Sequence, residues 1–204
     1  KTRRWQSIGS SQPTPINPRM AFDNLGHRNY AEDDKALAGL ARLRRDACPW
    51  GAPVAVEVGA WAGRSTRILA EAGFIVFAVD HWCGNKNDLL HNVADEIGPD
   101  NCFSTFCHNM GTSLLSTVFP LRGTSELMAS VWPRNRPIDL CFIDADHSYE
   151  ACRQDIKHWT PLMRKEGLLI GHDYAPDFPG VVQAVNETGP FREAGNAIWY
   201  RRIE

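Results

Sequence analysis

The chain has 204 residues, of which 43% are hydrophobic and 23% are charged. This balance is typical of a soluble globular domain with a substantial core. The 22 basic and 24 acidic residues give a formal net charge of −2. Because nucleic-acid-binding proteins usually carry a basic excess or a basic stripe, this charge argues against a nucleic-acid partner. No apolar run reaches the roughly 18 residues that a membrane span needs, so we expect no membrane partner.

The chain starts at Lys1 without an initiator methionine and without the apolar stretch of a secretory signal. Six cysteines are present, and none of them forms a Cys-x-x-Cys pair. This pattern indicates free, mostly buried thiols in a reducing compartment rather than a disulfide framework or a zinc site. We therefore expect a cytoplasmic protein.

In chain order, an N-terminal arm precedes alternating helices and strands. Residues 1–30 are rich in Ser, Pro, Asn and Arg without sustained periodicity, which indicates an arm or lid, and residues 31–204 are predicted to form a single domain. Helices are predicted over 31–47, 65–72, 124–131, 149–159 and 181–187, and strands over 54–58, 74–79, 117–121, 138–143, 168–170 and 197–201. Residues 88–97 and 102–115 fit helix or loop.

The order of these elements predicts the fold class. Strands that alternate with helices pair in parallel through crossover connections. Continuously apolar strands indicate a sheet that helices cover on both faces. The C-terminal stretch differs, because a Gly195-Asn196 turn between two short segments predicts an antiparallel hairpin. We predict an α/β, Rossmann-like three-layer sandwich, with a mostly parallel seven-stranded sheet and a C-terminal antiparallel hairpin.

The first predicted strand runs into a glycine-containing turn, EVGAWAGRST over residues 57–66. Gly59 and Gly63 permit a tight turn and a close approach of the backbone to a ligand. The turn is not GxGxxG, the pattern that brings a helix N-terminus against a pyrophosphate. It therefore favours a nucleoside ligand without a pyrophosphate, and the Glu57 carboxylate can organise a charged amino-acid group on that ligand.

The ends of the second and third predicted strands supply further candidate binding residues. Asp80 can accept hydrogen bonds from both ribose hydroxyls, a feature shared with NAD enzymes, so it indicates a nucleoside rather than one cofactor. Thr124 and Ser125 are placed to contact an adenine. His81 follows Asp80 and can stack on the adenine or line the pocket, whereas Trp82 fits the pocket and the core equally well.

Taken together, Glu-x-Gly-x-x-x-Gly-x-Ser-Thr followed by an acidic second strand end resembles the class I methyltransferases. The resemblance implies that S-adenosylmethionine is the cofactor. It implies that the residues which bind this cofactor are Glu57, Gly59, Gly63, Asp80, His81, Thr124, Ser125 and Asp144.

Ionisable side chains also follow the fourth and fifth predicted strands. Asp144, Asp146 and His147 follow residues 138–143, and His172 and Asp173 follow residues 168–170. Carboxylates that converge on a cleft repel one another unless they are protonated or bridged by a cation. Carboxylate oxygens suit Mg²⁺ or Ca²⁺, and a histidine ligand shifts the preference toward Mn²⁺, Fe²⁺ or Zn²⁺.

The pattern FIDADHSYE, with GHDY at the next strand end, resembles metal-dependent O-methyltransferases of the macrocin O-methyltransferase and cephalosporin hydroxylase-like families. It is more distantly similar to the catechol and caffeoyl-CoA types, and the similarity spans residues 53–187. The resemblance implies Asp144 and Asp173 as ligands of a divalent cation, Mg²⁺ or Mn²⁺. The third ligand in these families is an acidic or Asn residue beside Asp173. His172 and Tyr174 flank Asp173 here, and His172 is the predicted third ligand.

The same resemblance places His147 where these families carry a general base. The implied mechanism has Asp144 and Asp173 hold a metal that lowers the pKa of an acceptor hydroxyl, while His147 takes the proton. Asp146 can orient His147. The acceptor is expected to be a hydroxylated small molecule, such as a sugar, a macrolide or a phenol. The oligomeric state is left open, and a homo-oligomer is possible.

Three alternatives remain at this stage. An NAD-linked oxidoreductase shares the broad fold but needs the glycine triplet that this turn lacks. A non-catalytic nucleoside-binding domain would keep Glu57 and Asp80 but has no need of converging Asp144, His147 and Asp173. RNA methylation fits poorly with a near-neutral chain that has no aromatic and basic stripe.

Overall fold

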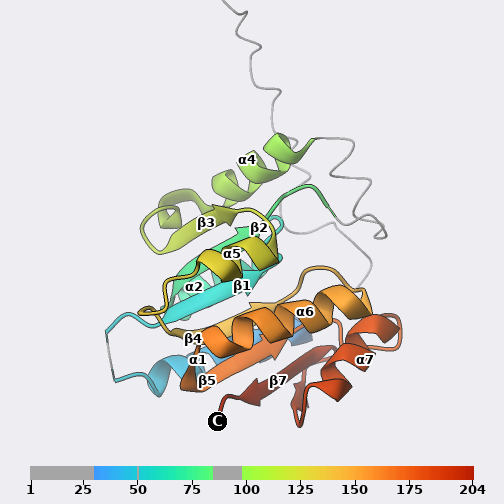
Figure 1. Cartoon of the computed structure of the whole chain (residues 1–204). Helices are drawn as coiled ribbons and strands as arrows, with labels where there is room; N and C mark the ends of the chain where they lie inside the picture. Colours follow the sequence, from blue (N-terminus) through green and yellow to red (C-terminus); the bar gives the residue numbers. More distant parts are fainter. Residues whose placement is uncertain (1–29, 50, 85–97) are drawn as a thin grey trace, which may run out of the picture.

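A seven-stranded sheet in the order β3-β2-β1-β4-β5-β7-β6 forms the middle layer of the computed structural model, which describes residues 30–49, 51–84 and 98–204 (Figure 1). The strands are β1 (Val54–Val58), β2 (Ile75–Asp80), β3 (Val118–Arg122), β4 (Ile138–Ile143), β5 (Met163–Gly171), β6 (Arg192–Ala194) and β7 (Ile198–Arg202). Strands β1 to β5 pair in parallel, and β7 runs antiparallel to both β5 and β6. The predicted fold class, including its C-terminal hairpin, is confirmed.

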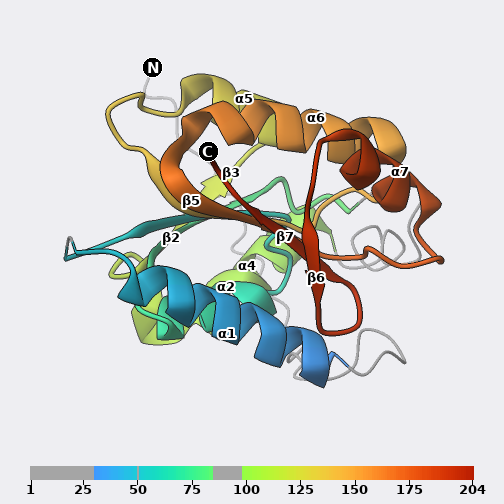
Figure 2. The same ribbon diagram turned by 90° about the horizontal axis from the view of Figure 1, so that it is seen from below.

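Helices cover both faces of the sheet, as Figure 2 shows from below. One face carries α1 (Ala31–Asp46), α2 (Arg64–Glu71) and α4 (Pro99–Met110), and the other carries α5 (Ser125–Val131), α6 (Tyr149–Trp159) and α7 (Pro179–Glu187). Two short 3₁₀ turns, η2 (Gly111–Ser113) and η3 (Thr160–Leu162), follow α4 and α6. Each face has its own apolar core: Leu37, Leu69 and Phe106 lie in the first core, and Ile156 and Trp159 lie in the second.

The strands buried on both faces agree best with the sequence prediction, and two later strands differ from it. β1 and β4 have the predicted bounds. β5 begins at Met163, five residues before the predicted start. The sequence pattern missed this first half because it is polar and contains Glu166 at φ 68°. The outer strand of the predicted hairpin is Arg192–Ala194. Residues 1–29 of the predicted arm over 1–30, and the segment 88–97, lie outside the described residues.

A buried ion cluster ties α1 to the sheet at the amino end of β4. Asp139 is 1% exposed, and its Oδ1 lies 3.1 Å from Nη2 of Arg44 and 2.9 Å from Nε of Arg164. Its other oxygen, Oδ2, accepts the backbone N–H of Val54 at 2.9 Å. One carboxylate therefore connects α1, β1, β4 and β5 at the edge opposite the polar strand ends.

Two further features of the described residues bear on the sequence predictions. Within this part of the chain, no helix has the length and apolar character needed to cross a membrane. All six cysteines fall in the described ranges and carry free thiols, and four of them are buried.

Candidate active site

The turn after β1 is packed directly against the end of β4. Gly59 has φ 92°, and its N–H donates to the carbonyl of Val79 at 2.9 Å. A Cβ atom on Gly59 would lie 2.0 Å from the backbone oxygen of Asp144. The strand order reverses beside β1, where open α/β sheets bind ligands, and the absence of a side chain at Gly59 allows this close approach.

Gly63 ends the same turn in a left-handed conformation, with φ 87°. A Cβ atom there would lie 2.4 Å from the terminal methyl group of Met110 in α4. Helix α4 also holds the turn through a polar contact, because Nδ2 of Asn109 donates to the carbonyl of Ala62 at 2.9 Å. Both predicted glycines therefore shape a compact turn between the sheet and α4.

Glu57 lies beneath this turn and is 0% exposed. Its two carboxylate oxygens accept hydrogen bonds from the hydroxyls of Ser65 and Thr66, in the first turn of α2. Burial raises the pKa of Glu57 to about 8, although these two hydrogen bonds oppose the shift. Glu57 thus fixes the start of α2 against β1, and a cationic group bound nearby would favour its ionised form.

Asp80 at the end of β2 holds the turn from the other side. Its Oδ2 accepts the N–H of Trp61 at 2.8 Å, and its Oδ1 accepts the N–H of Trp82 at 2.6 Å. Both tryptophans have positive φ, 41° for Trp61 and 57° for Trp82, a conformation that bulky residues rarely adopt. Trp82 is buried and packs against Phe103 and Phe106, so of its two predicted roles it takes the core role.

Three further candidates for the cofactor side lie in different surroundings. His81 is 39% exposed, and its Nδ1 accepts the N–H of Cys83 at 2.9 Å. Thr124 caps α5, because its hydroxyl accepts the N–H of Leu127 at 3.3 Å. The hydroxyl of Ser125 accepts the indole N–H of Trp159 at 2.9 Å and is therefore directed toward α6.

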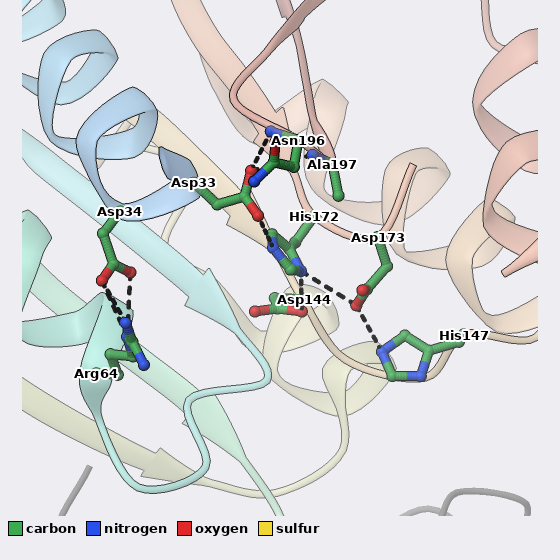
Figure 3. Close-up of polar contacts among 9 residues, drawn as sticks. All are labelled: Asp33, Asp34, Arg64, Asp144, His147, His172, Asp173, Asn196 and Ala197. Atoms are coloured by element: carbon green, nitrogen blue, oxygen red, sulfur yellow. Dashed lines mark hydrogen bonds and ion pairs between the residues drawn. The ribbon is translucent and has the colours of Figure 1, made fainter. Parts of the chain in front are cut away.

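The predicted acceptor side forms one cluster at the ends of β4 and β5 (Figure 3). Nε2 of His147 lies 2.9 Å from Oδ2 of Asp173, and Nδ1 of His172 lies 3.2 Å from the same oxygen. His172 also places Nδ1 3.7 Å from Oδ1 of Asp144. The ring of His147 packs on Phe178, with a centroid separation of 4.5 Å. The structure thus brings together four of the five residues that the sequence singled out here, Asp144, His147, His172 and Asp173.

Burial and charge shift the proton affinities of this cluster in opposite directions. Burial raises the pKa of Asp144 to about 6. Burial would also raise the pKa of Asp173, but hydrogen bonds from His147 and His172 outweigh it and hold that pKa well below its usual range. Burial would lower the pKa of His172, but Asp144, Asp173 and Asp33 outweigh it and raise that pKa to about 9. The two histidines therefore favour the ionised form of Asp173.

Three of these side chains fit the donor set of a divalent cation. One oxygen of Asp144, one nitrogen of His147 and one oxygen of Asp173 all lie within 4.8 Å of one another. Neighbouring ligands of an octahedral Mg²⁺ lie about 3 Å apart and opposite ligands about 4 Å apart, so this spacing is close to what an ion needs. The nitrogen in this set belongs to His147, whereas the sequence prediction had His172.

Several residues of the site were not found from the sequence. Asp33 and Asp34 in the first turn of α1 contact His172 and Arg64, respectively. Acidic residues are common in the first turn of a helix, where they interact favourably with the helix dipole. The sequence pattern therefore gave no sign that Asp33 and Asp34 contact the site. Asp146 also differs from its suggested role, because its Oδ1 accepts the N–H of Ser148 at 2.7 Å and so shapes the start of α6.

The sheet order, the compact glycine turn and the acidic end of β2 define a class I methyltransferase. The chain belongs to the methyltransferase domain family, whose sequence profile matches residues 56–174. It is an S-adenosylmethionine-dependent methyltransferase.

Solved structures agree on the fold at low sequence identity. Rv0187 from MTB, solved with a cofactor bound, has 14% identity and a TM-score of 0.63, covering 89% of this chain and 83% of its own. CalS11, a calicheamicin methyltransferase, has 16% identity and a TM-score of 0.61, covering 83% and 78%. A ribosomal protein L11 methylase from Lactobacillus delbrueckii subsp. bulgaricus has 17% identity and a TM-score of 0.55, covering 99% and 92%. The fold alone therefore does not select the methyl acceptor.

Proposed function

We propose that this protein transfers the methyl group of S-adenosylmethionine to a hydroxyl group of a small molecule, with His147 as the general base. The observation that carries the proposal is the contact between His147 and Asp173, 2.9 Å from Nε2 to Oδ2, at the strand ends beside the glycine turn. CalS11 is also described as a TDP-rhamnose 3′-O-methyltransferase, which supports a sugar or other small hydroxylated acceptor.

The contact with Asp173 assigns a tautomer to His147. When Nε2 donates to the Asp173 carboxylate, neutral imidazole carries its lone pair on Nδ1, and that nitrogen accepts the proton of the acceptor hydroxyl. The carboxylate then stabilises the imidazolium that forms. Packing on Phe178 fixes the plane of the ring. Both contacts orient the base before the acceptor arrives.

The transfer balances without an oxidant or a reductant. The cofactor supplies an electrophilic methyl group on a sulfonium. The acceptor oxygen forms a bond to the methyl carbon as the carbon–sulfur bond breaks, and the hydroxyl proton passes to His147. The products are a methyl ether and S-adenosylhomocysteine. Glu57, Gly59, Gly63 and Asp80 hold the cofactor side, so that the two reactants meet in one orientation.

A divalent cation has a place in this proposal. Asp144, Asp173 and His147 are the residues that would hold Mg²⁺ or Mn²⁺, and the ion would lower the pKa of the acceptor hydroxyl. The Nε2 atom of His147 cannot bind an ion and donate to Asp173 at the same time. His147 can therefore act either as the base or as a metal ligand. Measuring turnover after the metal is removed distinguishes these two roles.

The test is a methyl-transfer assay with radiolabelled S-adenosylmethionine and the full chain. The acceptor panel contains nucleotide sugars, phenols and catechols, with ribosomal protein as a separate arm. We expect label on an oxygen of a small molecule, and loss of turnover in EDTA with recovery on adding Mn²⁺ if the cation is required. Label on protein or on nitrogen alone would contradict the proposal, and turnover that EDTA leaves unchanged would remove the cation from it.

A further inference from the structure

The first turn of α1 places two adjacent carboxylates on two different parts of the site (Figure 3). Successive residues of a helix point about 100° apart, so neighbours in sequence face different partners. Asp33 is directed toward the cluster at the ends of β4 and β5, and Asp34 is directed toward the start of α2. Neither contact is explained by helix formation alone.

Asp33 joins three segments that are far apart in sequence. Its Oδ1 accepts the backbone N–H groups of Asn196 at 2.6 Å and Ala197 at 3.0 Å, in the turn between β6 and β7. Its Oδ2 lies 3.4 Å from Nε2 of His172 at the end of β5. A Cβ atom on Gly195 would lie 2.4 Å from Oδ1 of Asp33, so the turn is packed directly on α1.

The contact with Asp33 orients the ring of His172. Nε2 of that ring faces Asp33, and Nδ1 faces Asp173 at 3.2 Å and Asp144 at 3.7 Å. His172 and Asp33 are 9% and 7% exposed, so little solvent reaches the contact. Asp33 in α1 therefore fixes the orientation of the His172 ring through Nε2. The opposite nitrogen, Nδ1, then faces the carboxylates of Asp144 and Asp173.

Asp34 makes a separate contact with the cofactor turn. Nε of Arg64 lies 3.1 Å from both oxygens of Asp34, and Nη2 lies 2.5 Å from Oδ2. Such two-pronged arginine–carboxylate pairs fix orientation as well as distance. Arg64 directly follows Gly63 and opens α2, and its guanidinium lies 5.0 Å from the ring centroid of Tyr30. Asp34 therefore fixes the end of the glycine turn.

We propose that Asp33 is a positioning residue for the His172 and Asp173 cluster, and that Asp34 is a positioning residue for the cofactor turn. The proposal deepens the proposed function and rests on it. It makes the first turn of α1 part of the active site, with each carboxylate serving one half. The two residues are chemically identical and adjacent, so each is the matched control of the other.

The substitutions Asp33→Asn and Asp34→Asn in the full chain test this division. An Asn at residue 33 keeps an oxygen that can accept from Asn196 and Ala197, but it presents an amide to His172. The first readout is calorimetric titration with S-adenosylhomocysteine. We expect Asp34→Asn to weaken binding roughly tenfold, the scale of one lost charge-assisted hydrogen bond. We expect Asp33→Asn to change it by less than about twofold.

The second readout is the hydrogen-bonding state of the His172 ring nitrogens, measured by long-range proton–nitrogen NMR spectra. Asp33→Asn is expected to shift the His172 signals, and Asp34→Asn is expected to leave them in place. Calorimetry with Mn²⁺ adds a third readout, in which Asp33→Asn lowers affinity by roughly tenfold or more, as for other residues that orient metal ligands. Thermal melting of both variants shows whether the fold is kept.

Equal effects of the two substitutions on S-adenosylhomocysteine binding and on the His172 signals would overturn the proposal, because a general loosening of α1 would act in that way. Unchanged His172 signals in Asp33→Asn would also overturn it. If the unsubstituted chain binds no Mn²⁺, the cation is removed from the proposed function, while the NMR and S-adenosylhomocysteine readouts still decide the roles of Asp33 and Asp34.

Discussion

Replacing His147 by Ala is expected to lower kcat by about 10²- to 10⁴-fold and to leave the affinity for S-adenosylhomocysteine unchanged. A positioned general base contributes a factor of this size, and the proposed base, His147, contacts Asp173 and packs on Phe178. Turnover is measured with the acceptor that the methyl-transfer assay identifies, and binding is measured by calorimetry. A loss of kcat without a loss of affinity shows that the substitution removes the base and leaves the cofactor site intact.

His108→Ala is the control for that experiment, because His108 is exposed on α4, outside the cluster. It is expected to keep both turnover and binding. If His147→Ala loses cofactor affinity in the same proportion as turnover, His147 supports the cofactor side and is not the base. If His147→Ala retains turnover, the proton leaves the acceptor by another route.

Replacing Asp139 by Ala is expected to destabilise the fold by about 3 to 5 kcal/mol, the cost of removing one partner from a buried ion pair. The change leaves Arg44, whose side chain is 6% exposed, without its carboxylate, and it removes the acceptor for the N–H of Val54. The free energy of unfolding is measured by urea denaturation. A loss of this size is a large fraction of the stability of an ordinary domain.

The matched control is Glu32→Ala. Glu32 pairs with Lys35 at 2.8 Å on the exposed surface of the same helix, α1. Exposed pairs of this kind contribute little to stability, because solvent screens them, so the control is expected to change the free energy of unfolding little. If Asp139→Ala and Glu32→Ala cost the same, the ion cluster at the amino end of β4 does not hold α1 on the sheet.

The sequence could predict the cluster at the ends of β4 and β5 because parallel strands place their carboxyl ends at one edge. His147 and Asp173 follow two apolar strands, and sheet adjacency alone brings them close. The same reasoning found Gly59 and Asp80, since turns with a restricted backbone and acidic strand ends leave local signals.

The contributions of α1 could not be predicted in this way. The contacts of Asp33 with His172 and Asn196 depend on how a helix and a distant hairpin turn pack against each other, and no local pattern encodes that packing. The contact of the Ser125 hydroxyl with the indole N–H of Trp159 likewise has no local signal in the sequence. Long-range packing determines where these side chains point.

The measurement that tests the central claim most directly is a calorimetric titration of the full chain with S-adenosylhomocysteine, with NAD as the comparison ligand. Asp80→Ala removes the carboxylate that accepts from Trp61 and Trp82 and that the sequence predicts to bind the ribose, and Asp46→Ala removes an exposed carboxylate at the far end of α1. We predict binding of S-adenosylhomocysteine but not of NAD, abolished by Asp80→Ala and kept by Asp46→Ala. Failure to bind S-adenosylhomocysteine, or a preference for NAD, would contradict the account of the cofactor site.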